Sequence, residues 1–178
     1  MPLTPKQKFI KWFVRPYNRL KRVEGGDGAF VALAMGFQLC ERFYRIKSHT
    51  ITDHRSNAFL KPAAKAYNVD HPFFHDFWFL YRHGIQHQGS PKRKVRVLGS
   101  NPARYRRYKW AIDARFPERP VECVINNKKA ICIDPWKFTA FMLRKFLQNP
   151  KELEKSVSHA FGDIFPIPDD TPWIEHPH

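Results

Sequence analysis

The apolar residues between positions 29 and 47 recur at steps of three or four along the chain. They are Phe30, Leu33, Phe37, Cys40 and Tyr44. At this spacing they share one face of an α-helix, and the residues between them lie on the other faces. The pattern therefore predicts a long amphipathic helix over 29–47 whose apolar face packs on a core.

Aromatic residues dominate the stretch from 71 to 88, which also begins like a helix. Asp70 comes just before Pro72, and proline is favoured in the first helical turn because its missing N–H is not needed there. The rings of this stretch could form a core or offer stacking platforms to nucleic-acid bases, and core packing is the favoured interpretation.

Further helices are predicted over 58–67 and in the C-terminal part of the chain. Asp134 is suited to cap a helix that has Pro135 at its first position and runs to about 149. Another helix should occupy about 150–161. Residues 1–22 contain seven Lys or Arg and no Asp or Glu, and we expect them to form a basic amphipathic helix interrupted near Pro16.

One stretch follows a different pattern. Short β-branched runs at 121–125 and 130–133 flank Asn126, Asn127 and two lysines, which is typical of a β-hairpin with left-handed turn residues. The fold class we expect is mainly all-α. A single helical domain over 23–163 would carry this hairpin around 121–133 and a basic insertion at 92–109, with a Pro-rich tail at 164–178.

Charge narrows the choice of partners. The formal net charge is +15, from 31 Lys and Arg against 16 Asp and Glu, and such an excess favours polyanions, with RNA as the leading candidate. No window approaches the roughly 20 apolar residues of a membrane span, and residues 1–22 lack the apolar core of a secretory signal. We therefore expect a cytoplasmic protein with no membrane partner. The three cysteines, Cys40, Cys123 and Cys132, form no C-x-x-C pair and are expected to be reduced and mostly buried.

The positive charge is concentrated after position 90, and no carboxylate occurs between Asp76 and Asp113. The residues predicted to bind nucleic acid are Lys92, Arg93, Lys94, Arg96, Arg104, Arg106 and Arg107. A solvated basic loop is the alternative, but the lack of nearby acids favours phosphate binding. The cluster at 104–108 interleaves tyrosines with arginines, which suits a single strand.

Just before this segment, Arg82, His83 and His87 could carry out phosphate chemistry. Cleavage of RNA without a metal requires a base for the ribose 2′-OH, an acid for the leaving oxygen, and a cation for the phosphorane. Histidine and arginine can supply all three. On an ideal helix the five-residue step from Arg82 to His87 turns by about 140°, so a loosened turn at Gly84 or a second subunit would be needed to bring them together.

The segment Arg82-His83-Gly84-Ile85-Gln86-His87 resembles the R-x(4–6)-H motif of HEPN domains, which are helical bundles that commonly form homodimeric ribonucleases. The resemblance implies that Arg82 and His87 are catalytic, that His83 is the polar helper, and that Glu41 is the accompanying acid. It further implies single-stranded RNA as substrate, 2′,3′-cyclic phosphate products, no metal or other cofactor, and a role in toxin–antitoxin systems or antiviral defence, with an antitoxin or effector as partner.

Plainer interpretations stand beside these. Arg82 and His87 could simply complement the negative end of a helix dipole, and Glu41 could pair with Arg45 one turn away. The pairs His71/His75 and His83/His87 have a spacing that suits a metal. The chain could also be a non-catalytic helical module that binds nucleic acid or a protein partner.

Overall fold

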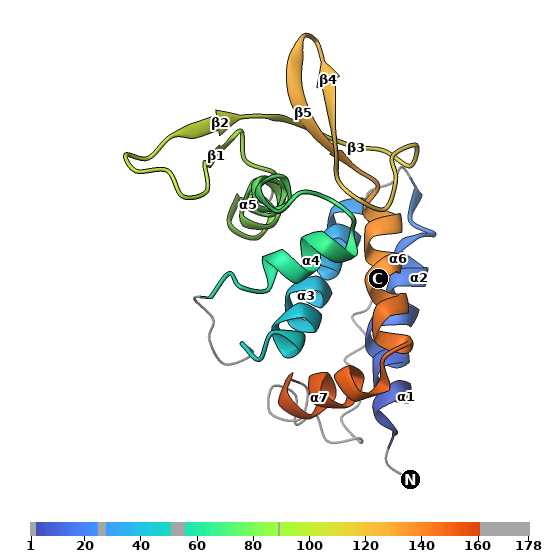
Figure 1. Cartoon of the computed structure of the whole chain (residues 1–178). Coiled ribbons are helices and arrows are strands. Elements are labelled where there is room, and N and C mark those ends of the chain that lie inside the picture. The colour runs from blue at the N-terminus through green and yellow to red at the C-terminus, as the bar shows by residue number, and fades with distance from the viewer. Residues whose placement is uncertain (1–2, 25–27, 51–55, 89, 161–178) are drawn as a thin grey trace.

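Helices form the body of the molecule, and strands form two small sheets at one end of it (Figure 1). The computed structural model describes residues 3–24, 28–50, 56–88 and 90–160, so the predicted tail over 164–178 lies outside the described residues. The fold is mixed α/β. The expectation of a mainly all-α bundle is therefore wrong.

The helices of the body lie close to where the sequence predicts them. They are α3 Ala29–Lys47, α4 Leu60–Ala66, α5 His71–Gln88, α6 Pro135–Leu147 and α7 Pro150–Ala160. The predicted cap of α6 is confirmed, because the Asp134 carboxylate accepts hydrogen bonds from the backbone N–H groups of Trp136 and Lys137, at 2.8 and 3.1 Å. Such bonds satisfy donors that have no partner within the first helical turn.

Aromatic rings fill the space between the helices. The Phe138 ring of α6 lies 5.2 Å from that of Phe37, 5.1 Å from Tyr67 and 5.6 Å from Phe77, and all four side chains are buried. The aromatic stretch of α5 thus packs mainly in the core, as favoured above. Helices α3 and α6 approach closely at Gly36, where a Cβ atom would lie 2.5 Å from Thr139 Oγ1.

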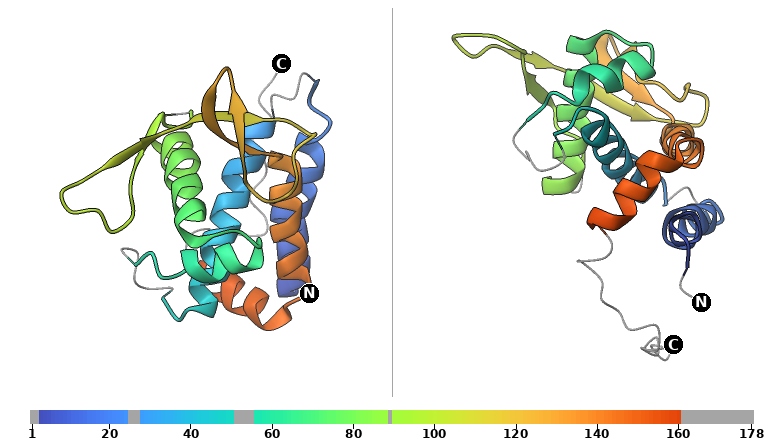
Figure 2. Two further views of the ribbon diagram at one scale, coloured as in Figure 1. Left: turned by 45° about the horizontal axis from the view of Figure 1, so that its top comes forward. Right: turned by 60° about the horizontal axis from the view of Figure 1, so that its bottom comes forward.

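The N-terminal segment is helical almost throughout. It consists of α1 Pro5–Phe9, a π-helix over Ile10–Val14, and α2 Arg15–Leu20. The regular α-helix is interrupted near Pro16, as predicted, but by a π-helical turn and not by a break in the helix. The wider turn accommodates a proline that has no N–H and whose ring crowds the preceding carbonyl. In Figures 1 and 2 this segment lies on the opposite side of the molecule from β1 and β2.

The strands account for the departure from an all-α fold. β1 Lys94–Arg96 and β2 Tyr105–Arg107 pair antiparallel as a two-stranded ribbon. The second sheet has the order β3-β5-β4, from β3 Lys109–Ile112, β4 Val121–Ile125 and β5 Lys128–Ile133, with β3 parallel to β5. The predicted hairpin is confirmed, including the left-handed backbone at Asn126 and Asn127, with φ of 50° and 57°.

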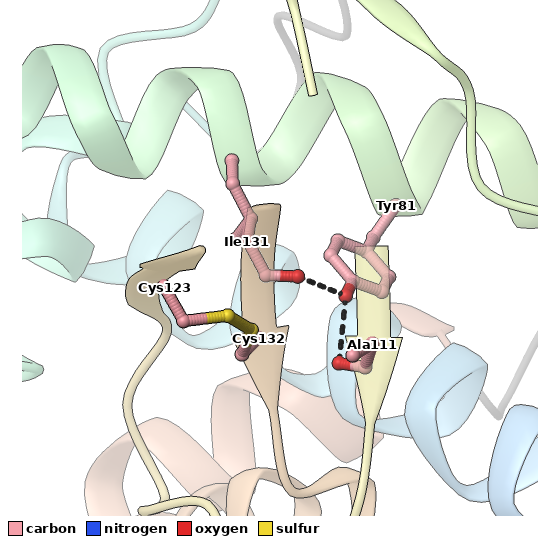
Figure 3. The surroundings of a disulfide bond; sticks show 5 residues. All are labelled: Tyr81, Ala111, Cys123, Ile131 and Cys132. Atoms are coloured by element: carbon pink, nitrogen blue, oxygen red, sulfur yellow. Dashed lines mark hydrogen bonds between the residues drawn. A yellow bond between two sulfur atoms is a disulfide. The ribbon is translucent and has the colours of Figure 1, made fainter. Parts of the chain in front are cut away.

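A tyrosine from the body fixes the second sheet. The Tyr81 hydroxyl lies 2.6 Å from the carbonyl oxygen of Ile131 and 3.0 Å from that of Ala111, so its proton is shared between β5 and β3 (Figure 3). Burial raises the pKa of Tyr81, which keeps the hydroxyl protonated. Helix α5 and the sheet are thereby joined at a buried polar point.

The prediction of three reduced cysteines is wrong for two of them. Cys123 of β4 and Cys132 of β5 form a disulfide across the hairpin, as Figure 3 shows. The strand pairing brings them together, because Cys123 is opposite Ala130 and Cys132 is opposite Val121. Cys40 is a free, buried thiol as expected, and burial raises its pKa.

Candidate nucleic-acid interface

A basic cleft of about 1250 Å³ opens between α5, the β1–β2 ribbon, β3 and the β4–β5 hairpin. Five of the residues predicted to bind nucleic acid line it, and they are Lys92, Arg93, Lys94, Arg96 and Arg107. Lys109, the last residue of the predicted basic segment, also lines it. Two further cations that the sequence analysis missed line it as well, and they are Lys128 and Lys129. Among the described residues that line the cleft there is no carboxylate.

Strand geometry decides which side chains of the ribbon face the cleft. In β1, Val95 is buried while Lys94 and Arg96 on either side are exposed. Opposite them in β2 stand Arg107, paired with Lys94, and Tyr105, paired with Arg96. Because alternate residues of a strand point to one side, these four share the face that lines the cleft. Lys94 and Arg107 are therefore two like charges directly opposite each other, an arrangement that destabilises a sheet unless an anion compensates for it.

Arg106 points away from this face, toward α5. Its Nη1 atom lies 3.0 Å from Oδ2 of Asp76, and the Tyr108 hydroxyl donates to the same oxygen at 2.9 Å. Asp76 is 1% exposed. Burial raises the pKa of its carboxyl, but the nearby His75 ring, 3.6 Å away, and the hydrogen bonds from Tyr108 and Arg106 outweigh that effect and leave the pKa below its usual value. Asp76 thus anchors the ribbon to the body as an ionised group.

The remaining cations have ordinary surface positions. Arg104 is exposed and is not among the residues that line the cleft. Lys129 reaches Oε1 of Glu122 at 2.9 Å across the hairpin. Only the parallel pairing of β3 with β5 brings Lys128 and Lys129 near Lys109. No local pattern could therefore have joined these two lysines to the basic segment over 92–109.

Two of the four predicted catalytic residues lie together, and neither of them lines the cleft. Nη2 of Arg82 is 3.0 Å from Oε2 of Glu41, whose other carboxylate oxygen lies 2.9 Å from Arg45 of the same helix. The side chain of Arg82 is only 23% exposed, and its buried Nε has no hydrogen-bond partner within the described part of the chain. The plainer pairing of Glu41 with Arg45 is therefore confirmed, and Arg82 shares that carboxylate as a link between α3 and α5.

His75 and His83 lie on a different face of α5 from Arg82. The His83 ring stacks on Phe79 at 4.4 Å, and His75 packs against the same ring at 4.5 Å. Phe79 lines the cleft, so His83 lies beside its α5 wall. The backbone of His87 belongs to the last turn of α5, but its side chain lies outside the described part of the structure.

Within the described residues, no group of three or more His, Cys, Asp or Glu side chains is placed to hold a metal ion. None of the described helices has the combination of length and apolar character that a membrane crossing requires. Comparison of the chain with protein-family models, with curated proteins and with solved structures gives no match.

Proposed function

We propose that the protein binds nucleic acid in the basic cleft. The observation that carries this proposal is the composition of the cleft wall, where eight of the thirteen lining residues are Lys or Arg and none is Asp or Glu. These cations come from the β1–β2 ribbon and the residues just before it, from β3 and from the hairpin. Among the carboxylates of the described residues, only that of Glu122 forms an ion pair with one of them, Lys129. A surface of this kind attracts a polyanion by releasing the counterions condensed on it.

The shape of the charge favours a chain of phosphates over one small anion. The cations come from β1 and β2, from the start of β3, and from the tip of the hairpin, so they are spread along the cleft. Lys94 and Arg107 repel each other across the ribbon in the absence of a ligand. A run of phosphates would relieve this repulsion and contact several cations at once.

The first test removes three cations that face the cleft. Replacing Lys94, Arg96 and Arg107 by alanine should lower the slope of log affinity against log salt by about 2, since each phosphate contact to a single strand contributes roughly 0.7. This change corresponds to about a 100-fold weaker binding near 0.1 M salt. Fluorescence anisotropy with a labelled 20-nucleotide RNA over a range of salt concentrations gives both quantities.

A matched control exists on the far side of the molecule. Lys11, Arg15 and Arg19 are exposed on the N-terminal helical segment, and replacing them by alanine removes the same net charge. The control variant should keep nearly the wild-type affinity and slope. Equal losses in both variants would show that net charge alone attracts RNA, and would contradict a cleft-specific site.

A second candidate function is metal-independent cleavage of the bound RNA. Two observations favour it: the 3.0 Å pair of Arg82 with Glu41, and the position of His83 beside Phe79 at the cleft wall. In this proposal His87 transfers a proton, Arg82 leaves Glu41 to stabilise the phosphorane, and His83 assists. A homodimer that completes the site belongs to the same proposal.

Product analysis separates the two functions. Wild-type protein in EDTA should cut a single-stranded RNA pool and leave 2′,3′-cyclic phosphate ends, while the Arg82→Ala/His87→Ala variant should bind RNA without cutting it. Cutting by both proteins, or by neither, would exclude these residues as the catalytic pair. Binding by the cleft would stand in either case.

A further inference from the structure

Tyr105 is exposed in a way that no other aromatic side chain of the described residues is. Its relative exposure is 58%, whereas every other Phe, Tyr and Trp in the described ranges is buried or partly buried. Exposing a large ring to water has a free-energy cost, and in this chain the other rings are used for the core. A ring left at the surface of a basic cleft therefore points to a ligand with a flat apolar face.

The residues around Tyr105 account for the orientation of its ring but give the ring no structural role. It stands opposite Arg96 in the ribbon, two residues before Arg107, and lines the cleft. Nζ of Lys94 lies 5.4 Å from the centre of its ring, which holds a cation against one face. No hydrogen bond joins its hydroxyl to another described residue, in contrast to Tyr108, whose hydroxyl is bound to Asp76.

Cations from both strands of the ribbon surround the ring. Lys94 and Arg107 form one cross-strand pair, and Arg96 and Tyr105 form the next pair on the same face. A base stacked on Tyr105 would therefore be flanked by cations that can hold a phosphate. Trp110, partly buried against Phe30 at 5.9 Å, is a second ring on the cleft wall. Single-strand binding sites combine a basic groove with aromatic platforms in this manner.

We infer that Tyr105 stacks on an unpaired base, so that the ligand of the cleft is single-stranded nucleic acid. This inference rests on the proposed binding function and specifies its substrate class. In a duplex each base is already stacked between its neighbours, and a side chain at the groove cannot lie on its face without opening the stack. Phosphate contacts alone would not distinguish the two forms, whereas a stacking ring does.

The test uses three polyanionic probes and two variants. The probes are a labelled 20-nucleotide single-stranded RNA, the duplex of that RNA, and inorganic polyphosphate as a competitor that has no bases. Tyr105→Leu removes the aromatic face and keeps an apolar side chain, and Tyr105→Phe keeps the face and removes the hydroxyl. Because Tyr105 is exposed, both variants should melt at nearly the wild-type temperature.

For single-stranded RNA, Tyr105→Leu should weaken binding by about 5- to 150-fold, the range that loss of one stacked base implies, while Tyr105→Phe should stay within about twofold of wild type. The salt slope should not change, because no charge is removed. Binding to the duplex and competition by polyphosphate should be the same in all three proteins.

Two results would overturn the inference in distinguishable ways. If wild type binds RNA but Tyr105→Leu binds the single strand equally well, or loses as much affinity for polyphosphate, the cleft recognises charge alone and only the stacking role fails. If wild type binds none of the probes, the proposed nucleic-acid function fails and the inference fails with it.

Discussion

The helical body and the β1–β2 ribbon at the sheet end are stabilised by different means. Strand β5 belongs with the body in this respect, because Ile131 and Ile133 are buried in the same core as the helices. In the body, buried rings such as Phe37, Phe77 and Phe138 pack against one another, and the burial of their apolar surface drives folding. At the sheet end, the β1–β2 ribbon has three residues in each strand, and only Val95 among these six is buried. A two-stranded ribbon of this size is not stable by itself in water.

Two polar anchors connect the sheet end to the body. Asp76 of α5 holds Arg106 and Tyr108, and Tyr81 of the same helix binds the carbonyl oxygens of Ala111 and Ile131. The difference between the two regions teaches that a fault in the core should unfold the whole protein, whereas a fault at an anchor should release the cleft while the body stays folded. Changes at the anchors test this comparison directly.

The larger effect is expected from Asp76→Asn. The substitution removes a buried charge that accepts charge-assisted hydrogen bonds from Arg106 and Tyr108, which should lower the free energy of unfolding by about 2 kcal/mol. RNA affinity should fall at temperatures where far-UV circular dichroism still reports the helices. Thermal melting and anisotropy measured on the same sample separate the two effects.

The control for this variant is Asp113→Asn. Asp113 also binds an arginine, Arg115, at 2.9 Å, but both side chains are near the surface and only two residues apart. Its replacement should change neither the stability nor the affinity comparably, because exposed ion pairs contribute little. Equal losses in the two variants would contradict the anchor role of Asp76.

The contribution of Asp76 to stability should depend on pH. The pKa of Asp76 is lowered in the folded state, so its stabilising contribution is fully present above the unfolded pKa, near 3.9, and is lost as the pH falls through the folded value. The stability difference between wild type and Asp76→Asn should be constant from about pH 7 to 5 and shrink below about pH 4. Urea unfolding at several pH values measures this difference. A difference that stays constant down to pH 2 would show that folding does not lower the pKa of Asp76.

The sequence predicted the parts of the fold that depend on local signals. Asp134 with Pro135 marks a helix start, and the two adjacent asparagines mark a hairpin turn, because each signal acts over a few residues. The ribbon was missed because its strands are short and nearly all of their residues are charged or polar, which hides the alternation around Val95. The pairing of β3 with β5 joins segments about twenty residues apart in sequence, and no local pattern contains it.

The difference between local signals and long-range pairing also explains which residues of the candidate site could be predicted from the sequence. A run of cations without acids identified five of the residues that line the cleft, since composition is visible in the sequence. It could not separate Arg107, which faces the cleft, from Arg106, which faces Asp76, until the strand and its partner were known. Cys123 and Cys132 were assigned as thiols because they form no C-x-x-C pair, although the predicted hairpin already placed them on neighbouring strands.

The smallest effects are expected from removing one tyrosine hydroxyl at the sheet end and one in the helical body. Tyr81→Phe removes the bond to β3 and β5, and Tyr17→Phe removes a bond of 2.8 Å to the Trp136 carbonyl within the helical body. Each should cost about 1 kcal/mol of unfolding free energy, the usual contribution of one hydrogen bond. Only Tyr81→Phe should also weaken RNA binding, by a few fold, since β3 carries Lys109 and β5 carries Lys128 and Lys129 to the cleft. Urea unfolding of the two variants measures the loss of stability, and fluorescence anisotropy measures their affinity for RNA. If Tyr17→Phe weakens RNA binding as much as Tyr81→Phe does, the cleft depends on global stability, and the two regions are not held separately.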